Sequence, residues 1–157
     1  MMRLAVAAVG KLDKLLVPVA GEYQKRLSRY AALETLETPL TPDPARPSAA
    51  LEAAVKAEEG ERLLARLKPG DVVIALHPTG TRMDTPAFAK ALADWTLRER
   101  VVFIVGGSLG LSDAALARAD ARLSLSDLTL PHGLARVVLL EQLFRACKIL
   151  AGERYHK

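Results

Sequence analysis

The chain has 157 residues, a formal net charge of +4 and one cysteine, Cys147. This length favours a single domain, 1–157, with room for a hydrophobic core. The lone cysteine gives no basis for a disulfide or a cysteine-based metal site, and it fits a reducing cytoplasm. The basic excess is too mild to indicate a nucleic-acid partner by itself. No apolar run approaches the roughly 20 residues that a membrane span needs.

The first half of the chain predicts two strands, two helices and a proline-rich loop between them. β-Branched and apolar runs indicate the strands, a first-turn proline indicates the first helix, and four closely spaced prolines indicate the loop. In chain order the predicted segments are Arg3–Val9, Pro18 to about Tyr30, Ala31–Thr38, Pro39–Pro47 and a helix capped by Ser48 that runs to about Leu67.

The second half continues the same alternation of buried strands and helices. Short apolar runs bounded by glycine and proline predict the strands, and Ser or Thr before a helical pattern predicts the helix starts. In chain order we expect a strand Asp71–Leu76, a loop His77–Asp84, a helix from Thr85 to about Glu99, a strand Val101–Val105, a helix from Ser112-Asp113, a strand Arg122–Leu125 and a helix Pro131–Leu150.

Strands that alternate with helices predict an α/β fold with a mostly parallel sheet and helices on both faces. In such sheets ligands bind outside the carboxyl ends of the strands. Three loops fall at these ends, namely Leu76–Arg82, Gly106–Leu111 and Ser126–Pro131. These loops are therefore the candidate ligand site.

Two of these loops each allow two interpretations. The glycines of Gly106–Gly110 lack the spacing of a dinucleotide fingerprint or a P-loop. They serve either a tight strand-to-helix turn or the close approach of a ligand to the backbone. In Leu125–Leu130, the small polar residues Ser126, Asp127 and Thr129 suit local hydrogen bonds to the backbone. Its three leucines are better explained as the wall of an apolar ligand pocket.

The remaining reactive side chains indicate no familiar catalytic apparatus. His77, His132 and His156 show no ligand spacing with acidic residues or cysteine, so no metal is expected. There is no nucleophile elbow, and Cys147 lies in an apolar helical run where it is most simply a small core residue.

The last predicted helix is apolar on two faces, which requires two burying surfaces. We expect the sheet to be one surface and a partner subunit to be the other. Glu141 and Arg145 are spaced i, i+4 and are expected to pair locally. The alternative is that Arg136 and Arg145 hold phosphates.

The final third carries motifs that are specific in combination. They are Gly106-Gly-x-x-Gly110, Leu123-Ser-Leu-Ser-Asp-Leu-Thr-Leu-Pro-His132, Arg136, Glu141-Gln-Leu-x-Arg-Ala146 and Tyr155-His156. Together they resemble the small SPOUT-class methyltransferases that modify a pseudouridine in bacterial large-subunit ribosomal RNA. The resemblance extends over essentially the whole chain, including Asp84-Thr-Pro86.

The resemblance implies a SPOUT-type fold with a C-terminal trefoil knot, a homodimer, and S-adenosylmethionine as the methyl donor. It implies N3-methylpseudouridine in 23S rRNA of the assembled ribosome as the product. The donor-binding residues that it implies are Leu76, Gly106, Gly107, Leu125, Ser126, Asp127, Leu128, Thr129 and Leu130.

Methylation of a ring nitrogen needs a base, or cations that stabilise the developing anion. The residues available for this are His132, Arg136, Arg145, Tyr155 and His156, and we expect Tyr155 and His156 to cap the substrate base. Which residue, if any, is the base stays open. The alternatives are a SPOUT methyltransferase acting on tRNA or on a ribose hydroxyl, and a non-catalytic ribosome-associated RNA-binding protein. A nucleotide-binding oxidoreductase lacks its fingerprint.

Overall fold

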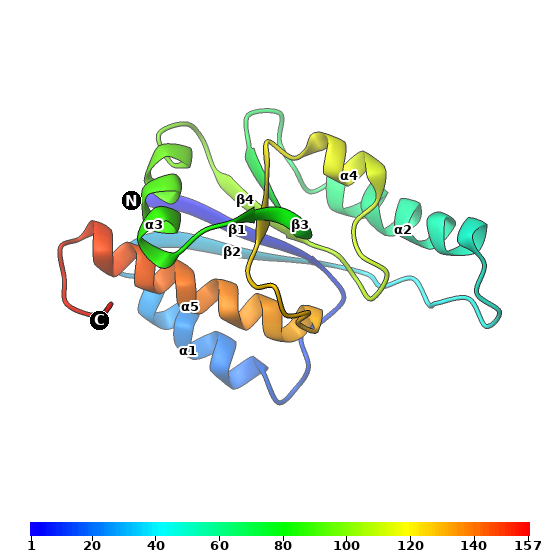
Figure 1. Ribbon diagram of the computed structural model, residues 1–157, viewed down its shortest axis with the longest axis horizontal. Helices are drawn as coiled ribbons and strands as arrows, with labels where there is room; N and C mark the ends of the chain where they lie inside the picture. Colours follow the sequence, from blue (N-terminus) through cyan, green and yellow to red (C-terminus); the bar gives the residue numbers. More distant parts are fainter.

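The computed structural model describes residues 1–157 and contains one five-stranded sheet in the order β2-β1-β4-β3-β5 (Figure 1). Every neighbouring pair of strands is parallel. The elements are β1 (Met2–Val9), α1 (Val17–Leu27), β2 (Ala31–Thr38), α2 (Ala49–Leu64), β3 (Val72–Arg82), α3 (Thr85–Trp95), β4 (Val101–Val105), α4 (Asp113–Arg118), β5 (Ala121–Ser124) and α5 (His132–Leu150). The predicted α/β class and element order are confirmed.

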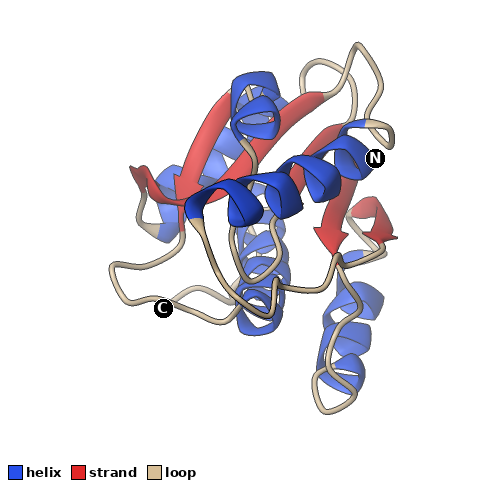
Figure 2. Ribbon diagram, turned by 90° about the vertical axis from the view of Figure 1, so that its right-hand side faces the viewer, coloured by secondary structure: helices blue, strands red, loops and turns tan.

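The sheet has helices on both faces, as predicted, and Figure 2 shows them on either side of the strands. Alternate residues of β1 point to opposite faces, so Leu4 and Val6 join one core cluster while Ala5 and Ala7 join the other. The larger cluster packs α1, α3 and α5 against the sheet, and the smaller one packs α2 and α4. The central strand β4 is buried along its whole length because both faces are covered.

Two of the three predicted helix caps are confirmed. Ser48 accepts a hydrogen bond from the Leu51 amide at 3.2 Å, and Ser112 accepts one from the Ala115 amide at 3.1 Å. The third prediction is wrong by one residue, because Asp84 rather than Thr85 caps α3 by accepting from the Ala87 amide at 2.8 Å. A carboxylate is as good an N-cap as a hydroxyl.

The first three helices end three or four residues earlier than predicted. Ser28 bonds the Lys25 carbonyl after α1, and Thr96 bonds the Leu92 and Ala93 carbonyls after α3. After α2, the Lys68 amide bonds the Asp71 carboxylate in the turn that leads to β3. Hydroxyl and carboxylate groups that bond nearby backbone compete with a further helical turn.

The predicted end of β3 at Leu76, followed by a loop over 77–84, is wrong. The strand continues to Arg82, and Leu123 of β5 pairs first with Leu76 and then with Thr81. A Cβ on Gly80 would lie 2.6 Å from the Leu123 carbonyl carbon, so only glycine lets this segment approach β5 so closely. The residues of this segment are typical of a loop, but beyond the bulge they pair with β5, which no local signal in the segment indicates. That strand covers 121–124, one residue earlier than predicted.

Helix α5 begins at His132, with Pro131 at its N-cap. Most residues on both apolar faces of this helix are buried within the chain, including Leu139, Leu143 and Phe144, because α1 and α3 flank the helix on top of the sheet. Cys147 is a buried core residue, as predicted, and burial raises the pKa of its thiol to about 11. The two apolar faces therefore do not by themselves require a partner subunit, and the homodimer stays a prediction. None of the helices has the length and apolar character needed to cross a membrane.

Candidate functional site

Two of the three candidate segments, Gly106–Leu111 and Ser126–Pro131, are loops at one edge of the sheet, and the third, Leu76–Arg82, is the part of β3 around and beyond its bulge at the same edge. β4, β3 and β5 are consecutive neighbours and all parallel, so the loops that follow them leave from the same side. This brings Leu76, the glycines at 106 and 107, and the segment 125–130 to one edge, as the fold class requires.

The glycine turn after β4 closes on itself. The Gly110 amide donates to the Gly107 carbonyl at 3.1 Å, and Gly110 has φ +90°, where glycine is favoured. A Cβ on Gly106 would lie 2.6 Å from the Gly110 carbonyl carbon. The tight-turn interpretation thus accounts for Gly106 and Gly110 without a ligand.

Gly107 has a different neighbourhood, in which the proline-rich loop and α2 close against it. A Cβ there would lie 3.1 and 3.2 Å from the two carboxylate oxygens of Glu59 and 3.2 Å from the Leu40 side chain. The Ser108 hydroxyl donates to Asp43, and the Thr41 amide donates to Glu59 Oε2 at 3.1 Å. The loop 39–47 is therefore docked on the glycine turn.

Sequence reasoning missed Glu59, although a signal was present. Val55, Glu59 and Leu63 are spaced four residues apart on α2 and all three are buried, so a carboxylate occupies a position of the apolar stripe. Burial raises the pKa of Glu59, and the charge of nearby Asp43 raises it further. The hydrogen bond from Thr41 lowers it, but the net shift is upward. A charged residue at a core-facing position of a helix is the kind of exception that marks a site.

The segment after β5 has both predicted features, local hydrogen bonds to the backbone and exposed apolar surface. Ser126 accepts from the Leu128 amide at 2.9 Å, and its carbonyl accepts from the Ser124 hydroxyl, so the local hydrogen bonds are present. Asp127 pairs instead with Arg82 at the end of β3. Leu125 and Leu130 are half-buried, whereas Leu128 is 77% exposed. An exposed leucine beside the strand ends is apolar surface available to a ligand.

A second cluster of predicted site residues forms at the other end of α5. Arg145 bonds Glu141 Oε1 at 2.6 Å, which confirms the local pair, and the Tyr155 hydroxyl donates to the same oxygen at 3.3 Å. The Tyr155 ring packs edge-on against Phe144, with centroids 4.9 Å apart. Burial and the Glu141 carboxylate raise the pKa of Tyr155, so its hydroxyl keeps its proton.

The chain beyond α5 is fastened to this cluster's side of the molecule. The Tyr30 hydroxyl donates to both oxygens of Glu153 at 3.0 and 3.1 Å, and Lys148 pairs with Glu153. Glu153 has a lowered pKa because Lys148 and Tyr30 hydrogen-bond its carboxylate. His156 follows Tyr155 and is exposed.

The two ends of α5 hold different parts of the predicted catalytic set. His132 is exposed at the first residue of the helix, next to the 125–130 segment, whereas Arg145 lies thirteen residues further along and carries the Tyr155 ring beside it. In Figure 1 the chain after α5 leaves from the end of the helix opposite to His132. Thirteen helical residues span roughly 20 Å at 1.5 Å per residue. A single chain therefore does not bring the tail residues to the three candidate segments.

Arg136 is committed to contacts within the chain. Its guanidinium bonds Glu37 at 2.8 Å and the Gly10 carbonyl at 3.4 Å, and its side chain is buried. These bonds tie α5 to the carboxyl ends of β1 and β2. As the structure stands, this side chain does not face solvent to hold a phosphate.

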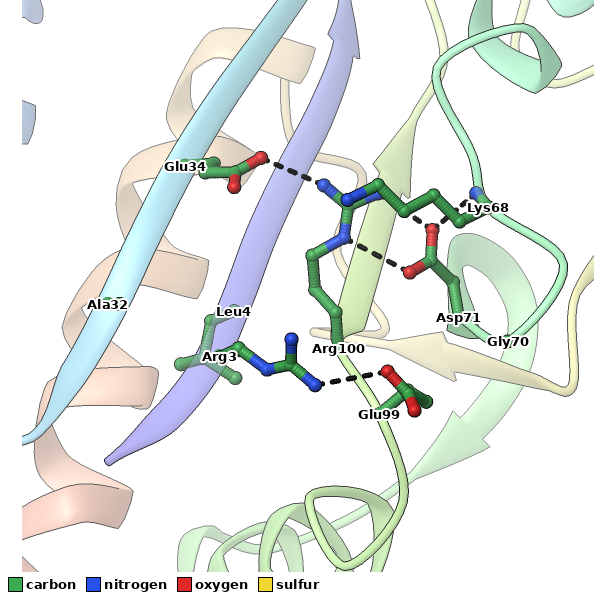
Figure 3. Close-up of a pocket in the computed structure, with 9 residues that line it drawn as sticks. All are labelled: Arg3, Leu4, Ala32, Glu34, Lys68, Gly70, Asp71, Glu99 and Arg100. Carbon is green, nitrogen blue, oxygen red and sulfur yellow. Dashed lines mark hydrogen bonds and ion pairs between the residues drawn. The ribbon is translucent and has the colours of Figure 1, made fainter.

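A hollow of about 320 Å³ lies at the opposite edge of the sheet, where the strands begin (Figure 3). Arg100 bridges Asp71 at 2.7 Å and Glu34 at 2.8 Å, and Arg3 pairs with Glu99 at 3.0 Å. Burial acts to raise the pKa of Asp71, but hydrogen bonds from Arg100 and the Lys68 amide outweigh it and leave the pKa lowered. These partners satisfy one another, so the hollow is a structural ion-pair network.

Comparison with known proteins gives consistent matches over the full length. The family model described as "Predicted SPOUT methyltransferase" matches residues 2–156. A protein of Ruminiclostridium cellulolyticum named ribosomal RNA large subunit methyltransferase H is 44% identical, covering 99% of this chain and 100% of the relative. One with the same name from Desulfitobacterium hafniense is 46% identical, covering all of both chains.

A solved structure described as a probable methylase family protein from Haemophilus influenzae shares the fold. Its TM-score is 0.57 at 13% identity, covering 100% of this chain and 72% of that one.

Proposed function

The chain belongs to the SPOUT methyltransferase family, and we propose that it methylates N3 of a pseudouridine in 23S rRNA of the assembled ribosome, with S-adenosylmethionine as the donor. The observation that carries the proposal is that the glycine turn after β4, the part of β3 beyond Leu76 and the segment after β5 lie at one edge of the sheet. The names of relatives 44% and 46% identical over their full length support ribosomal RNA as the substrate class.

The residues at this edge fit the proposed donor. S-adenosylmethionine combines a flat apolar base with hydroxyl, ammonium and carboxylate groups, and it supplies an electrophilic methyl group on a sulfonium. The exposed Leu128 and half-buried Leu125 offer apolar contact, while the glycine turn offers backbone polar groups and Ser126 offers a hydroxyl. A pocket that limits water favours a reaction in which positive charge is dispersed.

The N–C bond forms as the sulfonium S–C bond breaks, which leaves the sulfur of the donor as a neutral thioether, and the proton of the substrate nitrogen passes to water or to a basic side chain. We propose that the tail supplies the groups that orient the base and stabilise its anion. Arg145 stays cationic because Glu141 raises its pKa, and the protonated Tyr155 hydroxyl can donate a hydrogen bond. His156 is exposed and free to reach the substrate base.

A homodimer would bring the tail residues and the donor loops together. Because Arg145 and the Tyr155 ring packed on it lie roughly 20 Å along α5 from His132, a second copy must bring its tail to the first copy's loops if both act on one base. Exposed apolar residues at the starts of α1 and α5, including Leu15, Val17 and Leu134, give such a copy a surface to bury.

We further propose the C-terminal trefoil knot, residues 1–157 acting as one unit, and a cytoplasmic location. The family match supports the knot, and the part of β3 beyond its bulge lies directly against the β5 backbone, at Gly80 and Leu123. The family match over 2–156 supports the single unit.

The test is transfer of labelled methyl from S-adenosylmethionine to purified ribosomes, beside free ribosomal RNA, tRNA and ribosomes lacking pseudouridine. Label on assembled ribosomes at N3 of one pseudouridine is the expected result. Label on tRNA alone would show that tRNA, and not ribosomal RNA, is the substrate. An absence of both label and donor binding would favour a non-catalytic RNA-binding protein.

A further inference from the structure

A buried carboxylate lies against the glycine turn of the proposed donor site. Glu59 is 2% exposed, and both of its carboxylate oxygens lie within 3.2 Å of where a Cβ on Gly107 would be. Burying a carboxylate is costly unless it is fully hydrogen-bonded. Glu59 has only one such bond from the chain, from the Thr41 amide to Oε2.

The second oxygen, Oε1, has no hydrogen-bond donor within the chain. It is not sealed from outside, because the chain has no fully buried side-chain oxygen or nitrogen without a partner. Arg62, one turn further along α2, attracts the carboxylate by its charge but makes no hydrogen bond to it, since that guanidinium bonds Glu58, Thr41 and the Pro39 carbonyl. An acceptor that is nearly buried, unpaired and still accessible is suited to a ligand that brings a donor.

We propose that Glu59 is a further residue of the donor site, and that Oε1 accepts a hydrogen bond from a hydroxyl or ammonium group of S-adenosylmethionine. This inference rests on the proposed function. The loop 39–47 would then share in the site, because the Thr41 amide fixes the other oxygen and Asp43 accepts from Ser108 of the glycine turn. A side chain at Gly107 would crowd the carboxylate, which would have to shift by a few tenths of an ångström.

The sharpest variant is E59Q, measured by isothermal titration with S-adenosylmethionine. Thr41 needs an oxygen acceptor, so the glutamine amide must turn its NH₂ toward the ligand, where it cannot accept. The variant therefore keeps the hydrogen bond between Thr41 of the loop and residue 59 of α2, and it removes only the free acceptor. Loss of a hydrogen bond to a charged group predicts donor affinity weakened about 10- to 100-fold.

E58Q is the matched control, because Glu58 is the adjacent carboxylate, is exposed and pairs with Arg62 at 2.7 Å. Its donor affinity should equal that of the wild type. Equal affinity for E59Q and the wild type would overturn the inference. If the wild type itself fails to bind S-adenosylmethionine, the proposed donor falls instead.

Thermal unfolding without ligand shows whether E59Q is folded. If it is not, E59D compared with E58D tests the same point, because the shorter side chain keeps its charge but withdraws from Gly107. Donor affinity unchanged in E59D would then overturn the inference. Titration with 5′-methylthioadenosine, which has ribose hydroxyls but no ammonium, identifies the group that Glu59 binds. If Glu59 binds a hydroxyl, E59Q weakens the affinity for this compound. If Glu59 binds the ammonium, the affinity is the same in E59Q and the wild type.

Discussion

The guanidinium of Arg145 lies 4.5 Å from the centre of the Tyr155 ring, and both side chains bond the same oxygen of Glu141. One carboxylate on α5 therefore orders an arginine of the helix and a tyrosine of the tail together. Gln142 extends this network to Thr85 at the start of α3, with the Thr85 hydroxyl 2.7 Å from the Gln142 amide oxygen.

Replacing Glu141 by Gln should release this arrangement. Without the anionic acceptor, Arg145 and Tyr155 lose their shared partner, and we expect methyl transfer to ribosomes to fall by about tenfold or more, the cost of one charge-assisted hydrogen bond. Donor affinity should not change, because we propose that Arg145 and Tyr155 contact the substrate base and not the donor. E22Q breaks an equivalent i, i+4 pair on α1 and should retain activity. Full activity in E141Q would contradict the role of this network.

Replacing His156 by Ala tests the tail directly. The side chain is exposed, so we expect the free energy of unfolding to stay unchanged within about 0.5 kcal/mol. Turnover on ribosomes should drop while titration with S-adenosylmethionine gives the wild-type affinity. Unchanged turnover would remove His156 from the proposed site.

The ion pair between Asp71 and Arg100 should make stability depend on acid pH. The pKa of Asp71 is lowered in the folded state, so its contribution is complete above the ordinary value of 3.8 and is lost as the pH falls through the lower folded value. D71N should cost about 3 kcal/mol at pH 7, because Arg100 keeps a buried charge with one partner fewer. Urea unfolding at pH 7 and at pH 2 measures both effects, and the difference between D71N and the wild type should shrink at the lower pH.

Glu59 should have the opposite dependence. Its pKa is raised in the folded state, so the folded protein holds this proton more tightly than the unfolded chain does. Stability should then fall as the pH rises from the unfolded value of 4.5 through the higher folded value. E59Q, which does not ionise, should lack this fall and should be at least as stable as the wild type at pH 7. Thermal unfolding of E59Q and the wild type, measured from pH 4.5 upward to pH 7, tests this expectation.

The crossing of Gly80 over β5 should tolerate no side chain. A Cβ would meet the Leu123 and Ser124 backbone at 2.6 to 2.7 Å, so G80A should destabilise the fold by about 3 kcal/mol or more. G21A is the control, because its Cβ would meet nothing within 4 Å on helix α1 and should stabilise by about 0.5–1 kcal/mol. Chemical unfolding of the two variants at one pH gives the comparison, and equal stabilities would contradict this account of β3.

Local patterns were enough to predict most elements and the edge of the sheet that holds the candidate site. Short apolar runs such as Val101–Val105 and caps such as Ser48 are recognisable because their signals lie within a few residues. The extension of β3 to Arg82 was missed, since it depends on pairing with a strand about forty residues later in the chain.

Hydrophobic periodicity and the alternation of strands with helices are local properties, so they predict the parallel α/β architecture, the order of its elements and the edge of the sheet that holds the candidate site. The pairing of Arg136 with Glu37, the position of Glu59 against Gly107 and the bond from Tyr155 to Glu141 are visible only in the folded chain. Each of these depends on contacts between segments far apart in the chain, whose partners and distances no local pattern specifies.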